Sequence, residues 1–124
     1  MRGSNVIREK SKAFAVRIVR FVKYLRDEKG EQVLSKQILR SGTSIGANIF
    51  ESRNAQSKDD FVHKLSIALK EADETAYWLE VFLGAEIIDQ SMYNSLYSDL
   101  DELISLLVSI IKSSKLNSLE EKGK

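Results

Sequence analysis

Apolar residues recur along nearly the whole chain at spacings of three and four positions, and they almost never alternate every second position. This period is typical of amphipathic helices rather than strands. It predicts four helices, at about residues 6–29, 31–54, 58–86 and 90–116. Helices of this length with short links between them favour an all-α, antiparallel up-down-up-down four-helix bundle, a single domain over residues 1–124.

Residue types that start and stop helices mark the predicted ends. Gly30 follows Lys29 and can take the left-handed conformation that ends many helices. Ser57 and Asp60 have the spacing of a capping box, and Asp89 can cap the fourth helix. Because the chain has no proline, Gly, Ser, Asn and Asp must provide all its helix boundaries.

The stretch LRSGTSIGANIFES, residues 39–52, places two glycines inside a predicted helix, although each costs about 1 kcal/mol relative to alanine. It does not match a phosphate-binding loop, because no lysine follows Gly46 and no strand precedes Gly42. On a helix the two glycines lie one turn apart and let a second helix come closer than the usual ~8–10 Å. We interpret Ser41, Gly42 and Gly46 as a site of close helix packing, with ligand binding as the less favoured alternative.

One further residue of this stretch, Asn48, falls beside the apolar stripe of the second helix. A buried asparagine must find hydrogen-bond partners. We therefore predict that Asn48 is a buried polar residue that bonds to a neighbouring helix, for example to Thr75, and fixes the helix register. A ligand site at Asn48 is the less favoured alternative.

Three of the predicted helices carry apolar residues on a second face, away from the core stripe. One apolar face per helix is enough for a monomeric bundle, and an additional apolar patch usually marks an interface. We predict that the chain self-associates through Val16, Val19, Phe50, Ile67, Trp78 and Val81.

The net charge of +1 conceals a segregation of charge along the chain. Residues 1–30 are strongly basic, whereas residues 71–111 contain acids but no Lys or Arg. Either the basic helix binds nucleic-acid phosphates, or basic and acidic helices face each other, within a subunit or across an interface, and orient assembly. The near-neutral total favours assembly. The candidate phosphate contacts are Arg8, Lys12, Arg17, Arg20, Lys23 and Arg26.

The residues that usually carry catalysis or bind metals do not form a recognisable motif. His63 is the only histidine, and it lacks the preceding glutamate of a Glu-x-x-His di-metal motif. The absence of cysteine excludes disulfides and thiolate sites. We expect a non-enzymatic protein with no metal, cofactor or small-molecule substrate. The chain also has no apolar run of about 20 residues and no signal peptide, so we expect a cytoplasmic protein that does not enter membranes.

The segment LRSGTSIGANIFESRNAQSKDDFVHKLSIALKEADETAYWLEVFLGAEIID resembles a bacterial four-helix-bundle family encoded by intervening sequences within 23S rRNA genes. A more distant resemblance is to accessory proteins of diversity-generating retroelements, which also bind a reverse transcriptase. The resemblance covers about residues 12–112 and implies a bundle that assembles into a ring-like homopentamer. Basic surfaces of such assemblies are proposed to bind nucleic acid, and no catalytic residues are known for the family. Family members commonly have a small Ala-Glu-Gly-type ending where this chain has Phe50, Glu51 and Ser52.

Together these features predict an oligomeric helical bundle that binds RNA, DNA or a nucleic-acid-handling partner through its basic first helix. The alternative is a self-assembling protein-interaction module without nucleic-acid affinity, in which the same charges only orient the subunits.

Overall fold

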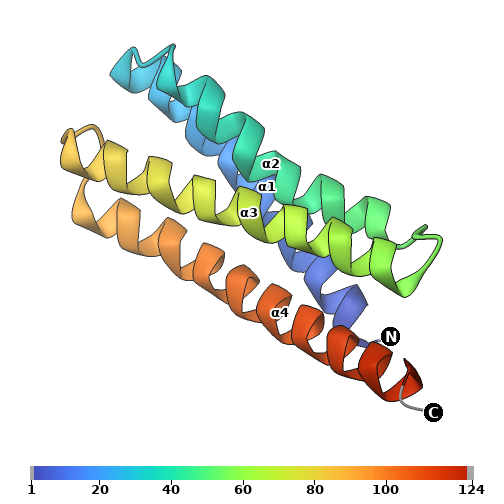
Figure 1. Ribbon diagram of the computed structural model, residues 1–124. Helices are drawn as coiled ribbons and strands as arrows, with labels where there is room; N and C mark the ends of the chain where they lie inside the picture. The colour runs from blue at the N-terminus through green and yellow to red at the C-terminus, as the bar shows by residue number, and fades with distance from the viewer. Residues whose placement is uncertain (1, 123–124) are drawn as a thin grey trace.

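The computed structural model describes residues 2–122, and it describes side chains for residues 5–117 and 119. In this part the chain forms four helices and no strand: α1 (Arg2–Lys29), α2 (Leu34–Ser52), α3 (Lys58–Gly84) and α4 (Gln90–Lys122). Successive helices run in opposite directions (Figure 1). The predicted all-α four-helix bundle is confirmed. No described helix combines the length and the apolarity that a membrane span requires.

Three helix ends form as their residue types predict. Gly30 has φ 64°, and the N–H of the next residue, Glu31, donates to the Leu25 carbonyl at 2.9 Å. The Ser57 hydroxyl accepts the Asp60 N–H at 3.0 Å at the start of α3. At the start of α4, Asp89 accepts the N–H of Met92 at 2.8 Å. These contacts satisfy backbone groups that a helix end leaves without partners.

Other boundaries differ from the prediction. α2 begins at Leu34 rather than residue 31, because the Glu31 carboxylate stands before the helix and accepts the Ser35 N–H at 2.8 Å. α3 ends at Gly84 rather than residue 86, because Glu86 adopts a left-handed φ of 61°. The N–H groups of residues 86 and 87 then turn back to carbonyls of the last helical turn, at 3.0 and 2.9 Å. α4 continues past residue 116, to Lys122.

One face of each helix contributes to a continuous core. α2 packs against both α1 and α3, and α4 packs against α3, whereas α1 and α4 share the smallest interface. Phe21 and Phe82 meet edge to face in the core near the end of α3, with ring centroids 5.9 Å apart. Near the end of α3, Phe82 is fully buried in the core, whereas the next residue, Leu83, is only half-buried.

The predicted burial of Asn48 is wrong. Its side chain is half-buried, and its amide donates to the Ser44 carbonyl one turn earlier at 2.9 Å, so it needs no partner on another helix. The buried polar contact between α2 and α3 involves Ser41, whose hydroxyl accepts from the Thr75 hydroxyl at 2.9 Å. Both of these residues are fully buried.

Candidate nucleic-acid interface

Five cations of α1 fall into two rows, of which one faces α4. Lys10 forms an ion pair with Glu102, which raises the pKa of the Lys10 ammonium through a hydrogen bond and charge attraction. Arg17 Nη1 lies 2.7 Å from Asp99 Oδ2 and donates to the Ser95 carbonyl at 3.0 Å. Arg17, predicted as a phosphate contact, is therefore engaged within its own subunit.

The second row lies on the outward face of α1, by which we mean Lys12, Val16, Val19, Arg20 and Lys23. All five residues are exposed, the two valines by 44% and 51%. None of the three cations forms an ion pair or hydrogen bond with any residue whose side chain the structure describes. The structure thus separates α1 cations that α4 neutralises from cations that point to solvent.

The remaining two predicted cations contact residues near the ends of α1. Arg8 donates to the Asn5 side-chain oxygen, and Arg26 Nε donates to Ser35 Oγ at 3.2 Å. Arg26 therefore links the end of α1 to the start of α2.

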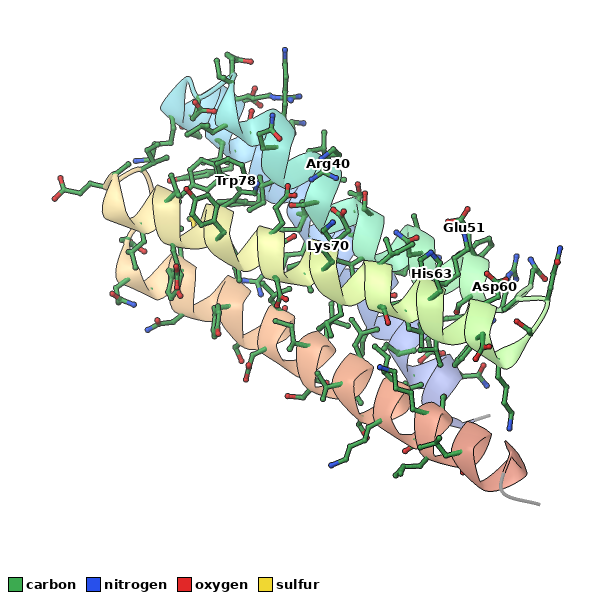
Figure 2. The ribbon with its side chains drawn as sticks, in the orientation of Figure 1. Arg40, Glu51, Asp60, His63, Lys70 and Trp78 are labelled. Carbon is green, nitrogen blue, oxygen red and sulfur yellow. The ribbon has the colours of Figure 1, made fainter. Side chains whose placement is uncertain are left out.

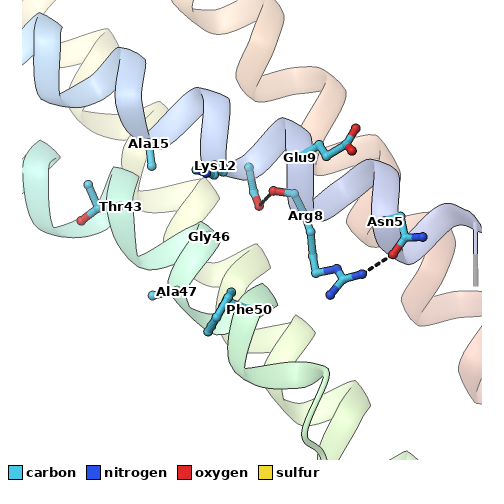
Figure 3. Close-up of a pocket in the computed structure, with 10 residues that line it drawn as sticks. Asn5, Arg8, Glu9, Lys12, Ala15, Thr43, Gly46, Ala47 and Phe50 are labelled. Carbon is cyan, nitrogen blue, oxygen red and sulfur yellow. Dashed lines mark hydrogen bonds between the residues drawn. The ribbon is translucent and has the colours of Figure 1, made fainter.

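A groove of about 450 Å³ runs between α1 and α2, next to the outward face (Figure 3). Its lining includes small residues of both helices, and bulkier side chains stand around them. Figure 3 shows Phe50 on α2 and Arg8 on α1 reaching toward the space from opposite helices. The lining residues that matter below are Arg8, Lys12, Ala15, Gly46, Ala47 and Phe50.

α1 and α2 approach each other closely at two glycines, Gly42 and Gly46, of which Gly46 lines the groove. A Cβ added at Gly42 would lie 2.9 Å from both Cγ atoms of Ile18, and one added at Gly46 would lie 3.3 Å from the Ser11 carbonyl oxygen. Ser41 points instead toward Thr75 on α3. The glycines lie at the α1 contact and the serine lies at the α3 contact.

Phe50 is the one aromatic residue of α2, and 54% of its surface is accessible. The Arg53 guanidinium lies over its ring, 3.7 Å from the centroid. Such a contact is a favourable cation–π interaction. Phe50 lines the groove, whereas Arg53 does not.

A family model described as 23S rRNA-intervening sequence protein matches residues 4–109. The chain belongs to this family. A 1.70 Å crystal structure of a protein of unknown function from the S23 ribosomal protein family of Bacteroides thetaiotaomicron VPI-5482 is also similar, with 56% identity and a TM-score of 0.88. The similarity covers 89% of this chain and 98% of that chain. No curated protein matches the sequence.

In this member of the 23S rRNA-intervening sequence family, the predicted interface residues of α3 are less exposed than those of α1. Ile67, Trp78 and Val81 are half-buried, and Trp78 packs against the core. Because α3 packs against both α2 and α4, only a narrow side of it remains open. Tyr77, which the sequence pattern did not single out, is 57% exposed there.

Trp78 also belongs to a polar cluster that joins α2 to α3, where Figure 2 labels Arg40 and Trp78. Arg40 Nη1 lies 2.9 Å from Glu71 Oε2, and its other terminal nitrogen pairs with Glu74. The Trp78 Nε1–H donates to the Glu74 carboxylate at 3.1 Å. This bond, followed by Arg40, holds the pKa of Glu74 below its usual value. The sequence analysis did not predict this cluster, although the opposite charges at residues 40, 71 and 74 could have indicated it.

The described side chains bring together no group of three or more His, Asp and Glu that could hold a metal ion. His63 is exposed on α3.

Proposed function

We propose that this protein is a non-enzymatic, oligomeric helical bundle that binds nucleic acid through the outward face of α1. The observation that supports the proposal is the division of the α1 cations. Lys10 and Arg17 pair with acids of α4, whereas Lys12, Arg20 and Lys23 are exposed and unpaired within the described residues. Lys and Arg on one helix face attract phosphate groups and supply most sequence-independent affinity for nucleic acid.

The three outward cations extend along one helix. From residue 12 to residue 23 the helix rises about 16 Å, so the cations can meet successive phosphates of one strand. Of the originally predicted contacts, Arg17 is already neutralised and Arg26 is bonded to Ser35. The proposed contact set is therefore Lys12, Arg20 and Lys23, with Arg8 at the adjoining groove.

A second candidate function is a self-assembling interaction module without nucleic-acid affinity. Its support is the exposure of Val16, Val19 and Phe50 on adjoining surfaces of α1 and α2. In that case acids from residues 71–111 of a neighbouring subunit would neutralise the outward cations. A homopentamer is the assembly that the family resemblance implies.

Fluorescence anisotropy with labelled RNA and DNA oligonucleotides, titrated at several salt concentrations, tests the first candidate. We expect affinity to fall as salt rises, with a slope of about −2 in log K against log salt for three phosphates of a single strand. Arg20→Glu with Lys23→Glu should weaken binding and flatten this slope. The matched control is Lys112→Glu with Lys115→Glu, which reverses two exposed lysines on α4.

Light scattering on the same variants separates the two candidates. If the α1 charge reversals dissociate an oligomer while nucleic-acid affinity is unchanged, the cations orient subunits and the second candidate replaces the first. An absence of binding at low salt would refute nucleic-acid binding altogether.

A further inference from the structure

We infer that the groove between α1 and α2 is a stacking site for an unpaired nucleobase, so that the protein prefers single strands to duplexes. This inference rests on the proposed function and names the ligand class that the surface accepts. Three features support it: the shape of the groove, the exposed ring of Phe50, and the distribution of charge around both.

The groove offers room for a planar group. Its volume of about 450 Å³ falls within the ~300–1,000 Å³ range typical of small-molecule sites. Ala15, Gly46 and Ala47 line it with little side-chain bulk. Gly46 lies close to the Ser11 carbonyl, and because residue 46 is a glycine, it places no side chain between the helices at this point.

Phe50 provides the stacking surface. An aromatic ring that is 54% exposed beside a groove has apolar area available for a ligand. Arg53 lies over the ring but does not line the groove, whereas Phe50 does, so we place the base against the part of the ring that lines the groove. Nucleobases stack on aromatic side chains in many single-strand-binding proteins, and every base has a face that can do so.

Two cations line the groove together with this ring. Arg8 and Lys12 line the groove, and Glu9 is the acid that lines it with them. Lys12 also begins the unpaired outward row that continues to Arg20 and Lys23. A strand with one base in the groove therefore has cations available for its flanking phosphates. A duplex cannot use the groove in this way, because its bases are paired and stacked inside the helix.

The test compares three labelled probes of equal length at fixed, low salt: single-stranded oligouridine, an abasic oligomer with the same backbone, and a duplex. We expect the single strand to bind more tightly than the other two. Phe50→Leu should weaken single-strand binding about 5- to 150-fold, the range that corresponds to loss of one stacked base. The same substitution should leave binding of the abasic oligomer unchanged. Tyr77→Leu is the matched control, because Tyr77 is equally exposed but lies on α3.

A second variant tests directly whether a base contacts the aromatic ring at residue 50. Phe50→Trp should retain single-strand affinity and should show fluorescence quenching on adding oligouridine beyond that of the unsubstituted protein, whose only tryptophan is Trp78. The abasic oligomer should produce no additional quenching.

The outcomes distinguish this inference from the proposed function. If salt-dependent binding occurs but all three probes bind equally and Phe50→Leu has no effect, the stacking site is refuted and the phosphate-binding surface remains. If none of the probes binds, both are refuted. If Phe50→Leu dissociates an oligomer, as measured by light scattering, a second copy of the chain occupies the groove and the inference is wrong.

Discussion

Gly42 marks the position where the Ile18 side chain of α1 reaches the backbone of α2. Ile18 is fully buried, and its two Cγ atoms lie 2.9 Å from where a Cβ at residue 42 would stand. Real Cβ atoms essentially never approach another heavy atom so closely. A glycine here costs helix propensity, and the close packing of α1 against α2 offsets that cost.

We predict that Gly42→Leu lowers the free energy of unfolding by about 1–3 kcal/mol, because extra side-chain volume at a tightly packed helix crossing forces the helices apart. Urea denaturation followed by circular dichroism measures the change. Gly84→Leu is the control, since an added Cβ there would meet nothing within 4 Å. It should leave stability unchanged or raise it through better helix propensity. Equal stability of the two variants would contradict the packing role of Gly42.

At the scale of whole helices, the α2–α3 interface combines an internal polar contact with a polar cluster at its edge. Ser41 and Thr75 share a hydrogen bond where neither side chain reaches solvent. Arg40 pairs with Glu71 and Glu74 farther out, where its own side chain is 49% exposed. Burial makes the first contact costly to break, and solvent screening makes the second one weak.

A double-mutant cycle tests the buried contact. Thr75→Val preserves shape but removes the α3 partner of the Ser41 hydroxyl, and we expect it to cost about 1–3 kcal/mol. Adding Ser41→Ala removes the unpaired hydroxyl, so the double variant should be more stable than the sum of the single effects predicts, by at least about 0.5 kcal/mol. Additive free energies from urea denaturation would show that the two hydroxyls do not stabilise the interface jointly.

The edge cluster predicts a specific pH dependence. Trp78 and then Arg40 lower the pKa of folded Glu74 from its ordinary value of 4.5. A lowered folded-state pKa contributes stability above the unfolded-state pKa, and this contribution is lost as pH falls through the folded-state value. Glu74→Gln should therefore be less stable than the unsubstituted protein at pH 7, by no more than about 1 kcal/mol because the pair is partly exposed.

This stability difference should shrink as the pH falls below about 4.5, as followed by urea denaturation across a pH series. The neighbouring Asp73→Asn is a suitable control, since Asp73 is exposed and forms no ion pair with the other side chains that the structure describes. A Glu74→Gln difference that stays constant from pH 7 to pH 3 would mean that the Glu74 charge does not stabilise the fold.

These contacts also show which features the sequence could predict. The ends at Gly30 and Ser57 were predictable because each depends on a few neighbouring residues. The hydrogen bond between Thr75 and Ser41 was not predictable, because it depends on the rotation and axial shift of α2 against α3. Apolar periodicity does not determine either of these. The left-handed backbone of Glu86 was also missed, because a glutamate gives no signal for a position where glycine is usual.

For the molecule as a whole, the segregation of charge along the chain has a partial structural explanation. Two ion pairs, from Lys10 and Arg17, connect basic α1 to acidic α4 across the smallest helix interface. Pairing inside the subunit was one of the two interpretations of the charge pattern, and the structure shows it for these two cations. The cations on the outward face have no partner among the residues whose side chains the structure describes, and their phosphate-binding role stays a prediction.

Self-association makes a prediction that does not depend on nucleic acid. If the outward face of α1 contacts a second copy, Val19→Asp should lower the mass measured by light scattering toward that of one chain, because it places a charge in an apolar contact. Val33→Asp is a strict control, since Val33 is also a highly exposed valine, at 71%, but precedes α2 and lies outside that face. A mass that stays above one chain in both variants would place the oligomer interface elsewhere. A loss of mass in Val19→Asp alone would assign the oligomer interface to α1. The nucleic-acid titrations would then report binding to the assembled form and would have to be interpreted as such.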